Sequence, residues 1–209
     1  MMKEKNKCKK CGDCCRNGPP TLHKEDAYLY KEGHIKRSHL ITYRKGEVIY
    51  DNVKDALISL DQEIVKLKSK KGKKECIFLE NNLCSIYPFR PKECRVFNCW
   101  NIRDFLEFYS KDRAQRLDLV SNPSALAEII IEHEKRCSVT ELNFYINEFK
   151  KTKDKDFLKK IHILLDQDRF FRDYLIEAGA DKEEFDFIFG KELTNFVPPE
   201  IMSLIDLKS

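Results

Sequence analysis

The pattern of hydrophobic and polar positions differs between the two halves of the chain. From Trp100 onward, apolar residues recur at the three- and four-residue spacing of amphipathic helices, for example at Phe157, Ile161 and Leu164. The stretch around Pro123 marks one break between such segments. The pattern predicts helices over 101–109, 112–120, 124–136, 139–151, 155–178, 182–190 and 199–206. The second half is therefore expected to be all-helical.

The first half instead contains short runs that are rich in β-branched and aromatic residues. Residues 39–44 and 47–50 predict the two strands of one hairpin, and residues 63–68 and 75–79 predict a second pair. Residues 58–67 could alternatively form a helix, because their apolar positions also fit that period.

Residues 1–22 are polar and rich in cysteine, so they are expected to form a loop that something other than an apolar core holds in place. A short helix is expected over 23–32, with Thr21 as its N-cap and Gly33 at its end.

These elements predict an α+β fold. A small, loop-rich cysteine-cluster module with short β-hairpins would occupy residues 1–100, and an all-helical domain would occupy residues 101–209. A length of 209 residues allows one domain or two small ones and does not decide between them.

Eight of the nine cysteines lie in two blocks, and their side-chain chemistry points to metal binding. The first block is Cys8, Cys11, Cys14 and Cys15; the second is Cys76, Cys84, Cys94 and Cys99. Thiolate is a soft ligand, and C-x2-C spacing lets two sulfurs on one turn reach the same ion or cluster. Eight ligands allow two four-cysteine centres, or one centre plus structural or reactive thiols.

Two spacings bear on how the cysteines divide between centres. Neighbouring side chains diverge, so one of Cys14 and Cys15 is expected to serve a second site. Cys94 and Cys99 would lie about 140° apart around a helix, so at least one of them is expected in irregular chain. We expect Cys8, Cys11 and Cys14 to join one cysteine of the second block, and Cys15 to join the other three.

The type of metal centre follows from the same spacing. Three cysteines in C-x2-C-x2-C with a remote fourth are typical of proteins that hold a [4Fe-4S] cluster, whereas zinc more often takes two pairs from separate loops. The sequence favours an iron-sulfur cluster, and zinc is the alternative.

Charge and composition indicate the setting of the protein. There are 39 basic and 35 acidic residues, a net charge of +4 that argues against a nucleic-acid partner. Basic residues gather beside the cysteines, at Lys3, Lys5, Lys7, Lys9, Lys10 and Arg16 and from Lys66 to Lys74. They could offset the charge of a thiolate centre or form a solvated edge.

The lysine-rich start and the lack of any long apolar run favour a cytoplasmic protein without a membrane span. In that reducing setting, disulfides are not expected.

The cysteine blocks and the residues around them resemble the YkgJ-like CxxCxxCC family, described as a zinc- or iron-chelating domain. The resemblance rests on Cys8-x2-Cys11-Gly12-x-Cys14-Cys15-Arg16, Cys76-Ile-Phe-Leu79 and Cys84-Ser-Ile-Tyr87-x2-Arg90-Pro91-x2-Cys94-Arg95-x-Phe97-x-Cys99. It covers about the first half of the chain. A similar domain occurs in flagellin lysine N-methylases, so the resemblance also implies an iron-sulfur-dependent protein-modifying enzyme as an alternative function.

Several other residues are candidates for the site or have a simpler interpretation. Arg16, Arg90 and Arg95 lie beside cysteines and could bind the cofactor by donating hydrogen bonds to thiolate or sulfide. Three histidines, His23, His34 and His39, could substitute as ligands. His133 is expected on a charged helix face. Cys137 is expected to be a small buried hydrophobic residue.

Phosphate-binding, nucleophile-elbow and radical-enzyme C-x3-C-x2-C motifs are absent from the sequence. The prediction is therefore a metal-binding cysteine-cluster protein with one or two iron-sulfur clusters and a redox, sensing or partner-enzyme support role, with catalytic residues unassigned. A zinc-stabilised interaction module that engages an acidic or nucleic-acid partner through the lysine runs is a further alternative. The helical half would supply the surface for a protein partner.

Overall fold

The computed structural model describes residues 8–206, and the chain divides into two compact units. The cysteine unit comprises the chain up to Ile41 and Ile64–Leu119; the helical unit comprises Thr42–Glu63 and the chain from Val120 onward. The fold is α+β, as predicted, with short antiparallel hairpins followed mainly by helices. The separate domains expected over 1–100 and 101–209 stay a prediction.

The cysteine unit is built from short elements. Its helices are α1 (Asp13–Arg16), α2 (Ala27–Lys31), α3 (Lys92–Val96), α4 (Arg103–Phe108) and α5 (Arg116–Leu119); its 3-10 helices are η1 (Lys24–Asp26), η2 (Arg37–His39) and η3 (Tyr87–Phe89); its strands are β4 (Ile64–Leu67), β5 (Leu79–Glu80) and β6 (Leu83–Cys84). A cyclic set of backbone hydrogen bonds joins Leu22, Val65 and Ala114, at N···O distances of 2.8 to 3.1 Å. All three residues are fully buried, so this junction forms the core of the unit.

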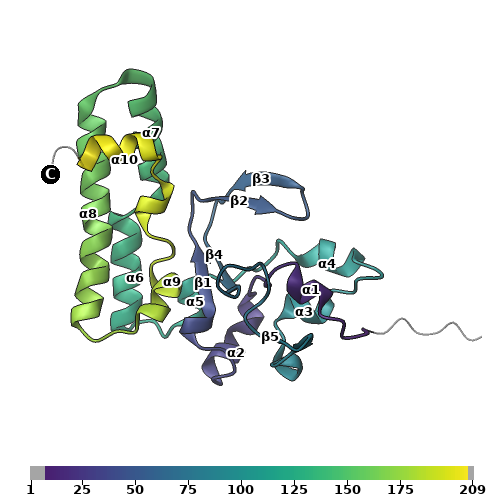
Figure 1. Cartoon of the computed structure of the whole chain (residues 1–209). Coiled ribbons are helices and arrows are strands. Elements are labelled where there is room, and N and C mark those ends of the chain that lie inside the picture. The colour runs from purple at the N-terminus through teal and green to yellow at the C-terminus, as the bar shows by residue number, and fades with distance from the viewer. Residues whose placement is uncertain (1–7, 207–209) are drawn as a thin grey trace, which may run out of the picture. The chain divides into compact units, whose positions relative to one another are not determined.

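The helical unit contains three long helices that lie side by side (Figure 1). Its elements are β2 (Val48–Asp51), β3 (Ala56–Ser59), α6 (Ala125–Arg136), α7 (Val139–Thr152), α8 (Lys155–Glu177), η4 (Lys182–Glu184), α9 (Phe185–Ile188), η5 (Leu193–Phe196) and α10 (Pro199–Asp206). Side chains of Ser124, Ser138 and Asp154 accept backbone N–H groups at the starts of α6, α7 and α8. Helix α8 packs against α6, α7 and α10.

Most predicted helices are confirmed. The structure has α4, α6, α7, α8, α9 and α10 within one or two residues of the expected bounds, apart from a 3-10 start before α9. Helix α5 is much shorter than the expected 112–120. The helix expected over 23–32 is present as η1 and α2, but His23 and not Thr21 occupies its N-cap. Thr21 instead forms a β-bridge with Lys66.

The predicted hairpin of residues 39–44 with 47–50 is wrong, although both segments contain strands; in the second expected pair, residues 63–68 contain β4 whereas residues 75–79 are strand at Leu79 alone. Strand β1 (Leu40–Tyr43) pairs with β4, and β2 pairs with β3. The chain leaves the cysteine unit within β1 and returns to it at the start of β4. The β2–β3 turn forms because the Asp51 carboxylate accepts the N–H groups of Val53 and Lys54. The helical alternative for 58–67 is also wrong. Cys76 bridges Ser69, so part of the second expected pair is present.

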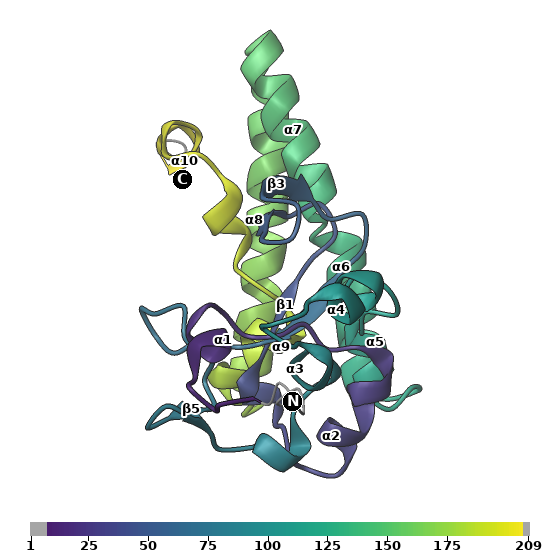
Figure 2. The same ribbon diagram turned by 90° about the vertical axis from the view of Figure 1, so that its right-hand side faces the viewer.

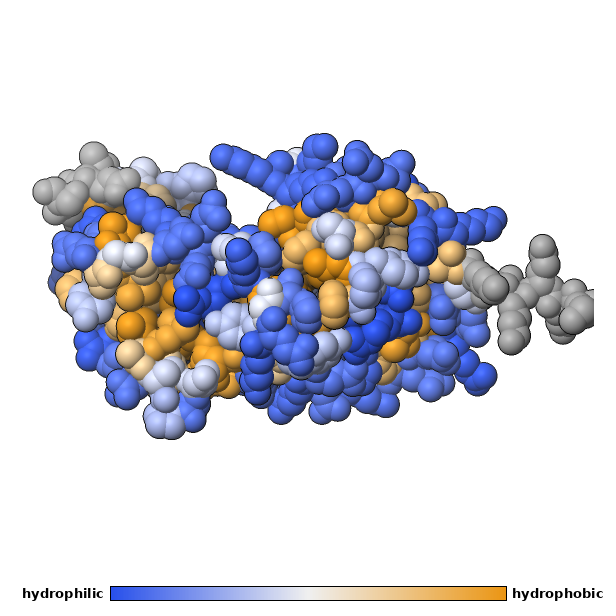
Figure 3. Space-filling model, turned by 90° about the horizontal axis from the view of Figure 1, so that it is seen from below, coloured by the Kyte–Doolittle hydropathy of each residue, from blue (hydrophilic) through white to orange (hydrophobic). Residues whose placement is uncertain are grey.

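Every helix within residues 8–206 is too short or too polar to cross a lipid bilayer. Apolar side chains nevertheless interrupt the hydrophilic surface in several places (Figure 3). On α8 they include Ile163, Phe170 and Tyr174, which share one face because they are seven and four residues apart.

Candidate metal centre

Backbone hydrogen bonds bring three cysteine-bearing segments together. The N–H of Cys76 donates to the carbonyl of Cys15, with an N···O distance of 2.8 Å. Strand β5 pairs with β6 so that Leu79 lies opposite Cys84. Both ribbon views show α1, α3 and β5 next to one another (Figures 1 and 2). Residues far apart in the sequence thereby reach one site.

The approach of α1 to the β5–β6 hairpin depends on Gly12. It has a φ of +79°, and a Cβ atom there would lie 2.9 Å from the carbonyl oxygen of Asn82 and 3.2 Å from Leu79. Glycine is the residue that adopts this backbone conformation without a steric cost and leaves room for the neighbouring strand. The sequence identified the cysteines but not this requirement.

Five thiols interact electrostatically with one another, and we call them the thiol cluster: Cys14, Cys15, Cys76, Cys84 and Cys94. A hydrogen bond from the Cys15 thiol lowers the pKa of Cys14 to about 6, while the same bond raises the pKa of Cys15. These two side chains therefore interact with each other, and the expectation that one of them serves a second site stays a prediction.

Burial shapes the rest of the cluster. Desolvation raises the pKa of Cys76 to about 11 and also raises the pKa values of Cys84 and Cys94. Buried thiols without a cation prefer the neutral form, and a bound metal ion reverses this preference because it stabilises the thiolate. The cluster thus has the donors of a metal site in a partly desolvated setting.

Three cysteines accept a hydrogen bond from the backbone amide two residues further along the chain. The N–H of Lys10 donates to the sulfur of Cys8 at 3.4 Å, that of Phe78 to Cys76, and that of Ile86 to Cys84. Amide hydrogen bonds stabilise negative charge on sulfur and orient the ligand. This repeated turn geometry suits thiolate ligands.

The remaining cysteines of the two blocks are more exposed. Cys8, Cys11 and Cys99 are exposed, and the thiol of Cys11 donates to Asp13 at 3.1 Å. Cys94 lies within α3, whereas Cys99 follows the end of that helix, which confirms that one of this pair is in irregular chain. All nine cysteines are free thiols.

The three candidate arginines have different surroundings. Arg16 clamps the first block: it donates to the Cys11 carbonyl and the Asn82 side chain, both at 2.7 Å, and pairs with Asp13. Arg95 pairs with the Glu25 carboxylate and donates to Tyr28 and to the Arg90 carbonyl, so its guanidinium is engaged away from sulfur.

Arg90 is the arginine whose charge acts on the thiol cluster. It lowers the pKa of both Cys14 and Cys84, although these are minor contributions beside the hydrogen bond and burial, respectively. Its guanidinium lies 3.7 Å from the ring centroid of Tyr87, and the Lys10 ammonium lies 4.6 Å from the same centroid. Within the described residues its buried Nε has no hydrogen-bond partner. A buried donor beside sulfur atoms fits a site for an anionic group.

The candidate histidines have partners other than sulfur. His23 is buried, with Nδ1 at 2.7 Å from the Lys111 carbonyl oxygen and Nε2 at 3.4 Å from Glu93. His34 stacks on Phe89, and His39 packs edge-on against Phe78. Lys3, Lys5 and Lys7 of the basic N-terminal segment lie outside the described residues.

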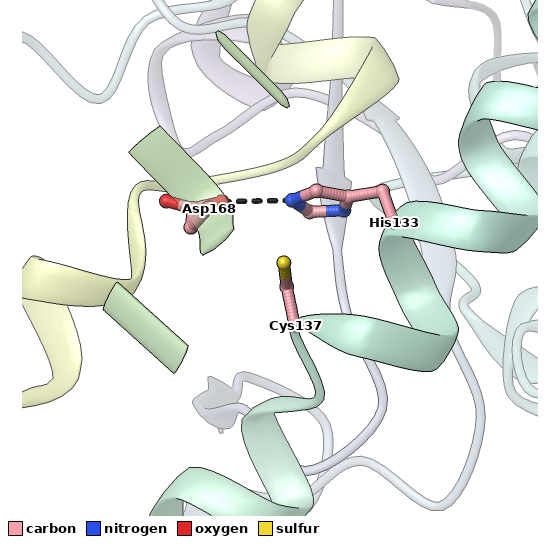
Figure 4. A group of neighbouring side chains, drawn as sticks. All are labelled: His133, Cys137 and Asp168. Carbon is pink, nitrogen blue, oxygen red and sulfur yellow. Dashed lines mark hydrogen bonds and ion pairs between the residues drawn. The ribbon is translucent and has the colours of Figure 1, made fainter. Parts of the chain in front are cut away.

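A second group of potential ligands lies in the helical unit (Figure 4). The ligand atoms of His133, Cys137 and Asp168 are all within 4.8 Å of one another, and Nε2 of His133 is 2.7 Å from Asp168. The prediction that His133 lies on a charged face is wrong, because it is fully buried. It follows Ala127 and Ile130 at three-residue spacing, so helical periodicity could have placed it inside.

The surroundings of this second group do not suit a cation. Both oxygens of Asp168 accept hydrogen bonds from Arg172, and one also accepts the N–H of Leu193. The guanidinium therefore neutralises the carboxylate already. Burial raises the pKa of Cys137 to about 12, and its full burial confirms it as a small core residue. The group is a buried polar network that joins α6, α8 and the segment before η5.

Comparison with known proteins gives one match. Residues 7–115 match the CxxCxxCC family model, described as "Putative zinc- or iron-chelating domain". No curated protein and no solved structure matches the chain. The matched region contains both cysteine blocks and ends before the long helices begin.

Proposed function

Because the chain belongs to the CxxCxxCC family of metal-chelating cysteine-cluster domains, we propose that its chelated group is iron-sulfur and that it serves a redox, sensing or partner-enzyme support role. The observation that carries this proposal is the gathering of five thiols from three separate segments beside a buried arginine donor. An iron-sulfur cluster, when bound, supplies one-electron chemistry.

The exposure of the cysteines supports a division into two centres. Cys15, Cys76, Cys84 and Cys94 are buried or half-buried and would hold an inner centre. Cys8, Cys11, Cys14 and Cys99 are exposed and would hold an outer centre. This division keeps the first three cysteines of the chain together, as their C-x2-C-x2-C spacing suggests.

A zinc ion and a cubane cluster require different sulfur spacings. Four sulfurs at 2.3 Å from one zinc ion in a tetrahedron would be about 3.8 Å apart, whereas a cubane needs more widely spaced ligands. Our preference for the cluster rests on the C-x2-C-x2-C spacing of the first block.

The chain's own residues would prepare the site in three ways. Backbone amides donate to Cys76 and Cys84 and favour their thiolate forms. Arg16 fixes the first block against the β5–β6 hairpin. Arg90 offers its Nε–H and a positive charge, which would raise the reduction potential of an anionic cluster. We place the protein in the cytoplasm, where thiols stay reduced.

Substitution of one half-buried ligand tests this proposal. The Cys84→Ser variant, prepared anaerobically, should lose about half of the iron and of the absorbance near roughly 400 nm if two cubane clusters are present. Cys137→Ser is the control, because it makes the same substitution at a fully buried cysteine of the helical unit that belongs to neither cysteine block. Equal iron content in both variants would contradict the assignment of Cys84.

A further inference from the structure

Charge is strongly segregated between the two units. The cysteine unit contains 23 basic and 12 acidic side chains, whereas the helical unit contains 16 and 23. The overall charge of +4 is therefore the sum of a net +11 on the cysteine unit and −7 on the helical unit. Even two thiolate centres of about −2 each would leave the cysteine unit well above neutrality.

Part of this charge lies in a turn next to the cysteine sites. Residues 70–74 connect Ser69 to Cys76, which form a β-bridge at the base of the turn. Lys70 and Lys73 share a single carboxylate, that of Glu75, at 3.8 and 3.9 Å. Lys71 and Lys74 are exposed, and the structure records no ion pair for either among residues 8–206.

Contacts place this lysine turn beside the first cysteine block. The ammonium of Lys70 donates to the Leu79 carbonyl, and the side chain of Leu79 lies against Gly12. Cys76, directly after the turn, is hydrogen-bonded to Cys15. Lys10, which lies between Cys8 and Cys11 in the sequence, and Arg90 both contact the ring of Tyr87. We call these cations the basic rim: Lys9, Lys10, Lys70, Lys71, Lys73, Lys74 and Arg90.

We propose that the basic rim docks an acidic one-electron carrier protein over the exposed cysteines. The inference rests on the iron-sulfur function proposed above and adds the class of partner. Opposite charge steers such proteins together, and their transient complexes use small interfaces. Exposed apolar residues, Leu83 beside Cys84 and Phe89 beside Arg90, supply contact area of the limited kind that such interfaces need.

The redox step balances with the carrier as the electron source. The reduced carrier would be oxidised by one electron, and a cluster held by the exposed cysteines would be the acceptor of that electron. No covalent bond forms or breaks. Exposure of Cys8, Cys11, Cys14 and Cys99 lets the partner approach the centre closely.

A nucleic acid is the competing polyanion, and the structure gives it less support. Single-stranded nucleic acids bind by stacking bases on aromatic side chains along a basic groove. Of the two rings at the rim, Phe89 stacks on His34, and Tyr87 already has the Arg90 guanidinium at 3.7 Å and the Lys10 ammonium against its ring. Its contacts with cations leave it poorly placed as a stacking platform.

Binding of an acidic plant-type ferredoxin to the metal-loaded full chain tests the proposal. Calorimetry should show a dissociation constant that rises at least about tenfold between about 10 mM and about 300 mM salt. The double variant Lys71→Glu/Lys74→Glu should weaken binding about tenfold at low salt. The control Lys155→Glu/Lys182→Glu makes the same change of charge on the helical unit and should stay within about twofold of the wild type.

Three outcomes separate this inference from the proposed function. Equal binding by both double variants, or a single-stranded RNA oligonucleotide that binds more tightly than the ferredoxin, would overturn the docking surface. Dithionite reduces a cluster without docking. If dithionite reduces the chain and ferredoxin reduces it at a rate that does not depend on salt, the docking surface is overturned while the iron-sulfur function stands. A chain that dithionite does not reduce would remove the redox function and the partner's role together.

Discussion

Gly12 decides how closely the first cysteine block approaches the β5–β6 hairpin. In Gly12→Ala, the new methyl group would meet the Asn82 carbonyl at 2.9 Å, in addition to the cost of about 1–2 kcal/mol for a left-handed residue. We expect a marked loss of bound metal, measured by elemental analysis. Gly72→Ala has a similar φ of +72° but open space, so it should retain its metal. Equal loss in both variants would show that backbone strain alone is responsible.

Asp168 is the centre of the buried network in the helical unit. Asp168→Asn removes the charge that Arg172 requires and should lower the free energy of unfolding by about 3–5 kcal/mol, because a guanidinium is left uncompensated. Urea denaturation measures this change. Asp166→Asn, on the same helix, removes a half-exposed carboxylate that pairs with Arg169 and should cost at most about 1 kcal/mol. Similar costs for the two variants would refute a special role for Asp168.

The same carboxylate gives a defined pH dependence. Burial raises its pKa, but the hydrogen bond to His133 and the charge of Arg172 outweigh burial, so the pKa falls from 3.8 to about 2. Because the folded-state pKa is depressed, ionised Asp168 stabilises the fold fully above about pH 4, and this contribution, about 2 kcal/mol, is lost as the pH falls through 2.

Comparison of the wild type with Asp168→Asn between pH 5 and pH 2 isolates this effect from acid release of metal, which both chains share. The difference in unfolding free energy should be constant at the upper end and shrink at the lower end. A difference that grows on acidification would have the wrong sign for a depressed pKa.

Among the secondary-structure elements, α1 and the β5–β6 hairpin are joined by one side chain. Arg16→Lys keeps the charge but cannot donate in two directions to Asn82 and Cys11. We expect faster metal loss to a chelator, measured by stopped-flow absorbance. Arg37→Lys, in η2 of the same unit, is the control and should lose metal at the wild-type rate. Loss of metal from Arg16→Lys at the wild-type rate would contradict the role of Arg16 in holding α1 against the hairpin.

The elements also show how far the sequence predicts the fold. Helices α6, α7, α8 and α10 were predictable because their caps and apolar spacing are local signals. Strand pairing was not, because β1 finds β4 across more than twenty residues and no local signal encodes that partner. A hairpin between neighbouring strands was the wrong default.

The candidate site was predictable to a similar, partial extent. The cysteine spacing and the family resemblance identified the ligand types, and the family is confirmed. The approach of Cys94 to Cys14, the contact of Lys10 with Tyr87 and the steric role of Gly12 depend on packing between segments far apart in the sequence. The ligand set itself stays a prediction that metal analysis must test.

For the whole molecule, the two units should respond differently to metal removal. The helical unit has its own core and its own buried network, whereas we expect the short elements around the cysteines to depend on metal ligation for part of their stability. Anaerobic chelation of the full chain should therefore remove amide hydrogen-exchange protection from residues around α1 and β5 while α7 and α8 stay protected. Loss of protection throughout both units would contradict independent stabilisation.

Mössbauer spectroscopy with iron and sulfide analysis of the anaerobically prepared full chain tests the central claim most directly. The account predicts about four or eight irons per chain, an equal amount of inorganic sulfide and the spectrum of a cubane cluster. A colourless chain that contains stoichiometric zinc and no sulfide would contradict it.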